Sequence, residues 1–244
     1  MTTWIAFKSI LLKDIKTYYL KPPNISWGLI FPISWTLMFF LRTQTPVDIH
    51  EFLPGLVALS ILFGTTSMLA VTITFEKKMA SFDRLLLAPI DLNVLMFAKT
   101  SGAIIFGIFN AMVPLVIAVL FTDISGINWL TATVSILLIS VTSTFLGLFI
   151  AVSVKEVFEA QTFSNFFRFP MIFLCGLFTP IATLPIVIRP LAYFLPLTYG
   201  VDILKYAING DNVFNLWLSI VVLFIFAGGL FFISIKNVKK KWIK

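Results

Sequence analysis

Charged residues are scarce in this sequence. Only 12% of its 244 residues are Asp, Glu, Lys or Arg, whereas a soluble domain carries about 25%. Hydrophobic residues make up 59% of the chain, and the mean hydropathy is +1.01. So little charge over so much apolar surface excludes an ordinary soluble globular protein. The chain needs lipid as its solvent.

Cysteine, histidine and phosphate-binding motifs are also scarce. The one cysteine, Cys175, excludes an intramolecular disulfide and a cysteine metal site, and we expect it to be a packing residue. The one histidine, His50, lies beside Asp48 and Glu51, where a solvated loop is a better interpretation than a metal site. None of the 12 glycines precedes a lysine, so the sequence holds no Gly-Lys-Ser/Thr phosphate loop. An ATP-driven function would therefore need a separate chain.

Long runs without charge are what the sequence contains instead. They are 25–41, 52–75, 100–122, 124–154, 169–188 and 212–235. A helix needs about 20 apolar residues to cross about 30 Å of hydrocarbon, and all runs but the first reach that length. Barrel strands are shorter and alternate in polarity, so these runs favour helices. We predict an all-α integral membrane protein in which 25–235 forms one domain of six transmembrane helices.

The basic residues predict the orientation of the chain. All but three of the 18 Lys and Arg residues lie in the segments 1–24, 76–99, 155–168 and 236–244. Positive charge collects on the cytoplasmic side of membrane proteins, so we expect both termini in the cytoplasm and a multi-pass protein of the cell membrane. The net charge of +7 then reflects topology and anionic lipid, and nucleic acid is not an expected partner.

The N-terminal segment 1–24 has the pattern of an amphipathic helix. Its apolar residues recur at steps of three and four, and its lysines fall on the opposite side. Such a helix lies along the membrane surface, as a passive anchor or as an elbow that also touches a partner. The apolar series is Trp4, Phe7, Leu11, Ile15 and Tyr18, and the lysines are Lys8, Lys13 and Lys16.

The cytoplasmic segment 76–99 predicts a helical hairpin. Residues 76–88 favour a helix, Pro89 interrupts it, and Asp91 suits the cap of a second helix that continues into the third span. The hairpin would be charged at its tip and apolar at its base. An ordinary cytoplasmic loop is the plainer alternative.

The outer segment 180–205 is rich in proline. Pro180, Pro185, Pro190 and Pro196 forbid one continuous helix, and the stretches between them are too short to span lipid. We expect the fifth span to break near Thr179 and Pro180, and short re-entrant helices to precede the last span. The alternative is a long loop on the outer surface.

Two segments together resemble the ABC-2 type permeases, the membrane subunits of ATP-binding-cassette exporters of the type V group. The first segment is the hairpin, through Glu76, Lys77, Lys78, Ala80, Ser81, Asp83, Arg84, Leu85, Leu86 and Pro89, with Ala80 where the family usually has glycine. The second precedes the last span, through Gly176, Pro180, Leu184, Pro185, Pro196, Leu197, Thr198, Tyr199, Asp202 and Lys205. Six spans and the N-terminal helix fit the same family.

The resemblance implies a division of labour between chains. A soluble ATPase subunit would bind ATP and Mg, and this chain would bind no cofactor and have no enzymatic activity of its own. Two copies would form the path for an exported amphiphile such as a drug, a lipid or a lipid-linked glycan. The ATPase contacts would be Glu76, Lys77, Lys78, Asp83, Arg84 and Pro89, and the outer gate would involve Pro180, Pro185, Pro196, Tyr199 and Gly200.

Two other classes of function compete with this interpretation. An ion-coupled secondary transporter places ionisable residues inside its spans, and the charge-free runs offer none. Their most polar residue, Asn110, is expected to hydrogen-bond between helices. An integral membrane enzyme needs a catalytic cluster, and no paired carboxylates fall within a span.

Overall fold

The computed structural model describes residues 2–21, 49–121 and 126–243, together with residues 30, 33, 34, 37 and 38. Within these residues the chain is helical, without a strand. The N-terminal helix α1 (Thr2–Asp14) continues into the π-helix η1 (Ile15–Tyr19). The predicted first span, 25–41, lies almost entirely outside the described residues.

Four described helices are long and apolar enough to cross a membrane. They are α4 (Ile49–Lys78), α6 (Leu92–Phe121), α7 (Trp129–Ser153) and α11 (Leu216–Lys241). These helices correspond to the predicted second, third, fourth and sixth spans. The short helix α5 (Ser81–Leu86) lies between α4 and α6.

The predicted fifth span differs most from the sequence-based boundaries. Helix α8 (Val157–Leu174) begins 12 residues before the predicted start at 169 and ends at Leu174, before the expected break at Pro180. Gly176 then takes a left-handed backbone conformation, with φ of 75°. Three short helices follow: η3 (Ile181–Thr183), α9 (Arg189–Tyr193) and α10 (Pro196–Asn209). Short helices in this segment agree with the prediction, while their re-entrance stays a prediction.

The bundle is organised around α4, which packs against α6, α7, α8 and α10. Where α4 crosses α7, a side chain at Gly147 would stand 2.4 Å from the carbonyl oxygen of Thr66, so only glycine permits this approach. Hydroxyl groups inside the helices mostly donate to a backbone carbonyl one turn earlier in the same helix, as Thr65 does to the carbonyl of Ile61 at 2.9 Å. Asn110 differs from expectation, since its buried amide makes no hydrogen bond to the described residues.

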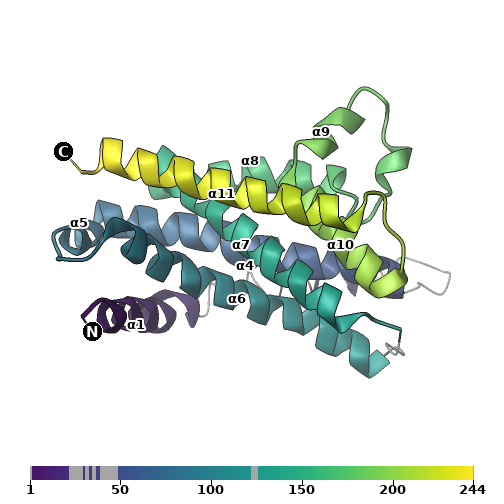
Figure 1. The fold of residues 1–244 in the computed structure, drawn as a ribbon, viewed down its shortest axis with the longest axis horizontal. Helices are drawn as coiled ribbons and strands as arrows, with labels where there is room; N and C mark the ends of the chain where they lie inside the picture. Colours follow the sequence, from purple (N-terminus) through teal and green to yellow (C-terminus); the bar gives the residue numbers. More distant parts are fainter. Residues whose placement is uncertain are drawn as a thin grey trace.

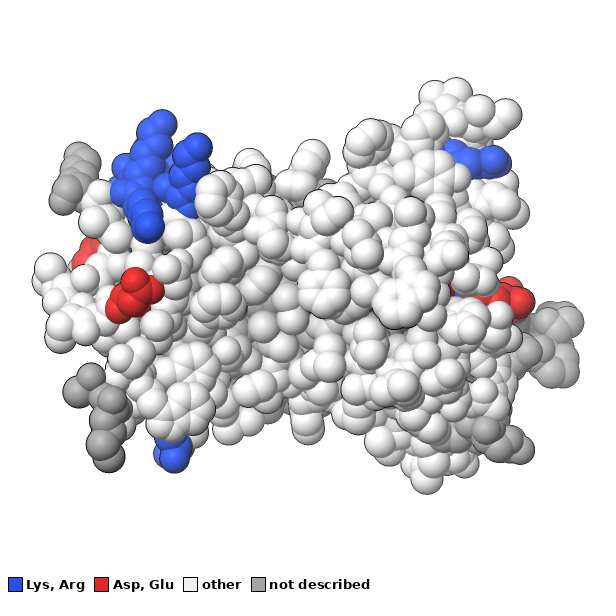
Figure 2. Space-filling view, in the orientation of Figure 1, with Lys and Arg blue, Asp and Glu red and all other residues white. Residues whose placement is uncertain are grey.

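Both chain ends lie at the same end of the bundle, beside α5, and α9 projects at the opposite end (Figure 1). Lys and Arg gather at the end that carries the termini, and the middle of the visible face is free of charge (Figure 2). This charge distribution is what a membrane-crossing bundle with one basic end requires.

Candidate functional site: the cytoplasmic hairpin and the outer segment

The hairpin predicted from 76–99 consists of the end of α4, α5 and the start of α6. Its turn forces Ala80 into the left-handed region, with φ of 54°. As predicted, Asp91 caps α6: its Oδ1 accepts a hydrogen bond from the backbone N–H of Asn93 at 2.8 Å. The predicted helix over 76–88 is instead two helices, because the turn at Met79 and Ala80 separates α4 from α5.

A cluster of four charges, three of them buried, lies at the base of this hairpin. Lys99 of α6 is fully buried and forms ion pairs with Asp14 of α1, at 3.0 Å, and with Glu76 of α4. Lys13 of α1 also pairs with Glu76 and lies 3.6 Å from Asp14. Two carboxylates and two ammonium groups balance each other. The cluster therefore joins α1, α4 and α6 through mutually neutralised charges.

Burial and the neighbouring charges together set the pKa shifts of the α1 residues in this cluster. Burial raises the pKa of Asp14 above its ordinary value, more than the nearby charge of Lys99 lowers it. For Lys13, burial acts to lower the pKa, but the hydrogen bond and the charge of Glu76 outweigh it, and the pKa is raised. Sequence reasoning missed this cluster because Asp14, Glu76 and Lys99 are far apart in the chain. The sequence offered one signal for this cluster, which is that each of these three helices carries a charged residue near its cytoplasmic end.

The six predicted ATPase-coupling residues are thus not equivalent. Glu76 is fully buried in the charge cluster, so the structure places it inside and not on the hairpin surface. Lys77 pairs with Asp83 and lies over the ring of Trp242, with its Nζ 5.2 Å from the ring centre. Lys78 pairs with Glu156 at 2.6 Å on the exposed surface.

The outward surface of the hairpin combines apolar groups with Arg84, for which no ion pair is seen among the described residues. Arg84 and Pro89 are exposed, as are Met79 and Leu87, the last with 86% of its surface accessible. Below them, Phe82 is fully buried against Trp242 in an edge-to-face contact. The hairpin is therefore fixed from below by Phe82 of α5, and Met79 and Leu87 on either side of α5 give it an exposed apolar surface with Arg84 outward. The sequence analysis singled out the charges and overlooked Met79 and Leu87.

The residues of the predicted outer gate separate into two groups. Pro180 and Pro185 lie on an exposed arm that runs from Thr179 to Phe194. Arg189 folds this arm by donating from Nη2 to the carbonyl oxygens of Ala182 and Leu184, at 2.5 and 3.2 Å. The arm is apolar on its outside, with Ile186, Val187 and Phe194 among its most exposed side chains.

The second group, Pro196, Tyr199 and Gly200, lies in α10 and is buried. The hydroxyl of Tyr199 donates to the carbonyl of Tyr193 at 2.9 Å and so ties α10 to α9. A Cβ at Gly200 would stand 2.4 Å from Cγ1 of Ile139, which explains why glycine is needed where α10 crosses α7. Five expected gate residues thus belong to two structural units.

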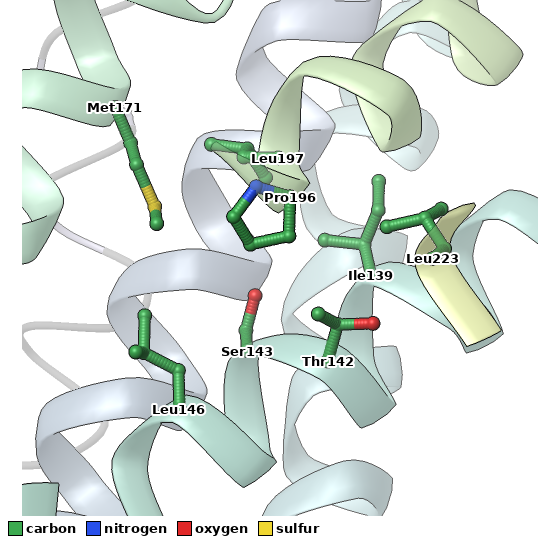
Figure 3. Close-up of a pocket in the computed structure, with 8 residues that line it drawn as sticks. All are labelled: Ile139, Thr142, Ser143, Leu146, Met171, Pro196, Leu197 and Leu223. Atoms are coloured by element: carbon green, nitrogen blue, oxygen red, sulfur yellow. The ribbon is translucent and has the colours of Figure 1, made fainter. Parts of the chain in front are cut away.

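Helix α10 begins above a small cavity between α7, α8 and α11 (Figure 3). The cavity holds about 10 Å³, roughly the space that one water molecule needs. It is lined by Ile139, Thr142, Ser143, Leu146, Met171, Pro196, Leu197 and Leu223. The middle of α10 is fixed to the start of α11, because Asp202 accepts hydrogen bonds from the backbone N–H of Val213 and Phe214 and from Ser219.

Comparison with known proteins agrees with these features. The family model of the ABC-2 type transporter matches residues 5–209. The chain belongs to the ABC-2 type transporter family. It is also 25% identical over 235 residues to the inner membrane transport permease YadH of Escherichia coli K12, and equally to the proteins of that name from Escherichia coli O157:H7 and Shigella flexneri. The alignment covers 91% of this chain and 90% of YadH.

Membership of this family identifies the chain as a membrane subunit of an ABC transporter, a transport permease that associates with an ATPase subunit. Such subunits normally have no ATP-binding site of their own. The match spans the N-terminal helix, the hairpin and α10, so it includes both segments on which the sequence-based resemblance rested.

Proposed function

We propose that this permease forms, as a pair of identical chains, the path for ATP-driven export of an amphiphile across the inner membrane. Each copy engages one ATPase subunit, which binds ATP and Mg, and both termini of the permease lie in the cytoplasm. The basic end of the bundle and the name of the relative YadH support this placement.

The observation that carries the proposal is the anchored hairpin. The hairpin presents Met79, Arg84 and Leu87 to the outside, while Phe82 and the buried pairs of Lys99 hold its base. A rigid element with an exposed apolar surface suits docking into a cleft of the ATPase subunit. Force applied to α5 then reaches α1, α4 and α6 together, because the charge cluster joins them.

The dimer is supported by the outer face of α8. Its exposed residues include a series of phenylalanines: Phe158, Phe163, Phe166, Phe169 and Phe173. Cysteines replacing Phe169 and Phe173 should crosslink two copies, and a cysteine replacing the buried Ile172 should not. Gly176, two residues after the end of α8, lies away from this exposed face, since it is buried and an added Cβ there would meet Ile181.

The hairpin is tested by reversing charge on its surface. In the variant with Lys78→Glu and Arg84→Glu, we expect ATP-dependent transport in proteoliposomes to fall at least about tenfold, because opposed charges destabilise the docked interface by more than roughly 1.4 kcal/mol. Membrane insertion should be unchanged, since both side chains are exposed.

The matched control is Lys155→Glu with Lys236→Glu, which changes the net charge equally, away from α5. Transport should survive in this control. Full transport by the hairpin variant, together with unchanged copurification of the ATPase subunit, would show that α5 is not the docking element.

The outer gate stays part of the proposal. Motion of α10 above its cavity would open the outer end of the path, with bending at Pro185 and Gly200. Replacement of Pro196 or Tyr199 should impair transport while the ATPase subunit still copurifies. Loss of copurification in these variants would mean that the segment acts on overall folding.

A further inference from the structure

The last helix, α11, ends against the cytoplasmic hairpin. Its C-cap residue, Trp242, contacts Phe82 of α5 edge to face, with 5.0 Å between the ring centroids. Lys77, at the end of α4, lies over the same indole ring and also pairs with Asp83 of α5. Phe82 and Trp242 are 160 residues apart in the chain. The end of α11 is therefore part of the support beneath the hairpin, although the two are distant in sequence.

The start of α11 is joined to α10. Asp202 of α10 accepts hydrogen bonds from the backbone N–H of Val213, at 2.6 Å, and of Phe214, at 3.3 Å, just before α11 begins. It also accepts one from the hydroxyl of Ser219, at 3.1 Å, in the first turn of α11. Asp202 and Ser219 are both buried. The first turn of α11 is therefore fixed to α10, the helix that carries part of the proposed outer gate.

Between these two contacts α11 runs along one side of the bundle (Figure 1). Ser219 and Trp242 are 23 residues apart, or about 34 Å along the helix axis. No proline interrupts α11, whereas α4 contains Pro54 and α6 contains Pro114. Helix α11 packs mainly against α7 and α10, and the face turned away from them is exposed and apolar. A helix with neighbours on one side can slide along its axis while the core stays packed.

Helix α4 offers another route from the hairpin to α10. It is continuous with the hairpin and also packs against α10. However, α4 is enclosed by α6, α7, α8 and α10, and at Gly147 of α7 it approaches too closely for any side chain. Sliding α4 would disrupt these contacts in the centre of the bundle, because close-packed interiors resist small displacements. The peripheral α11 is the less constrained route.

We propose that α11 transmits movement of the hairpin to α10, with Trp242 as the positioning residue at one end and Asp202 at the other. This inference rests on the proposed function, in which the hairpin docks on the ATPase subunit and α10 belongs to the outer gate. When the ATPase subunit moves α5, Phe82 displaces Trp242 and α11 slides along α7. The hydrogen bonds of Asp202 then carry α10 with the start of α11.

Hydrogen exchange at Val213 and Phe214 tests this link without a transport measurement. Their backbone N–H groups exchange faster when the hydrogen bonds to Asp202 open. The permease and its ATPase subunit are placed together in nanodiscs, and exchange is followed by mass spectrometry with and without adenylyl imidodiphosphate and Mg. We expect the nucleotide to change the exchange rate of these amides at least about fivefold, the usual size of coupling between distant sites. Trp242→Ala should abolish this response.

Matched variants separate positioning from general stability. Trp242→Phe keeps an aromatic ring against Phe82 and should keep the response, also if Trp242→Ala folds poorly. Trp217→Ala makes the same change in the same helix, where the side chain is 74% exposed, and should keep the response. Ser219→Ala removes one bond of Asp202 and should weaken it. A response that persists in Trp242→Ala, or that is absent from the natural chain, overturns the proposal.

The middle of α11 supplies a second test. A Cβ added at Gly228 or Gly229 meets nothing within 4 Å. Replacing both by alanine therefore stiffens the helix without crowding it, and the response should persist or increase. Loss of the response in this double variant would mean that α11 has to bend at these glycines, which contradicts transmission along a straight helix.

These results are separable from the proposed function. Export that fails in proteoliposomes while the exchange response still depends on Trp242 contradicts the export proposal alone. Export that is ATP-driven and unaffected by Trp242→Ala, with the exchange response also unaffected, contradicts only the role of α11.

Discussion

The cytoplasmic hairpin and the outer segment are both short helices between long ones, but they are held in different ways. Ion pairs fix the hairpin, with Lys99 buried between Asp14 and Glu76. Hydrogen bonds to backbone groups fix the outer segment, as in the contacts of Arg189 and Tyr199 with main-chain carbonyls. Ion pairs join separate helices rigidly, whereas the backbone bonds of the outer arm lie mostly within the arm.

This difference suits a transporter that is driven from one end. The hairpin must transmit force to three helices at once, and a buried ion cluster resists separation because each charge loses its partner. The outer arm can move as a unit, since its own hydrogen bonds travel with it. Breaking each kind of contact should therefore have consequences of different size.

The largest effect is expected from Lys99→Met. It leaves Asp14 and Glu76 buried with Lys13 as their remaining partner, and breaking a buried ion pair from one side costs about 3–5 kcal/mol of folding free energy. The midpoint of unfolding in mixed detergent and SDS micelles, followed by tryptophan fluorescence, measures this loss. Lys155→Met, at an exposed site, is the control and should change stability by less than about 0.5 kcal/mol. A loss below about 1 kcal/mol for Lys99→Met would mean that the cluster is solvated and does not bind the helices together.

A smaller effect is expected at the crossing of α10 and α7. Gly200→Ala places a methyl group against Ile139, and overpacking of this kind costs about 1–3 kcal/mol. The double variant with Ile139→Ala should lose less than the sum of the single losses, because the added methyl group finds space. Gly228→Ala is the control, since nothing lies within 4 Å of its added Cβ. Additive losses measured in the same unfolding assay would contradict the close contact.

The smallest effect is expected at the turn of the hairpin, and it is a gain. Ala80→Gly removes the strain of a left-handed alanine, which outweighs the entropy of the added glycine by about 0.5–1 kcal/mol. Ser81→Gly should instead lower stability, because it removes the hydrogen bond from Ser81 Oγ to the carbonyl of Glu76. A loss of stability in Ala80→Gly would show that the turn changes conformation in the assembled transporter.

Much of the fold was predictable because hydrophobic length is a local signal. The run over 52–75 falls within α4, and the runs over 100–122 and 212–235 supply most of α6 and α11, with 212–215 preceding the start of α11 at Leu216. The cap at Asp91 could also be predicted, because its hydrogen bond to the backbone N–H of Asn93 joins residues only two positions apart. The fifth span was predicted less well, because Glu159 and Arg168 interrupt the apolar run, so the first turns of α8 resembled a loop in the sequence.

The candidate site was predicted in position but not in detail. The charged residues at 76–84 marked the hairpin, but charge alone does not distinguish a surface contact from a buried pair. Glu76 and Lys78 are two residues apart, and one is buried with Lys99 while the other is exposed beside Glu156. Positions two apart on a helix point in different directions, and which one faces inward depends on the neighbouring helices.

The sequence by itself determined the class of this protein, its helices and its family, because apolar length, proline positions and short motifs act within one stretch of chain. Only the tertiary structure decided which charges are partnered. Asp14, Glu76 and Lys99 meet because three helices converge at one depth, whereas Arg168, also buried, has no ion pair among the described residues. The free energy of a buried charge depends on neighbours distant in sequence, so only the packed bundle determines it.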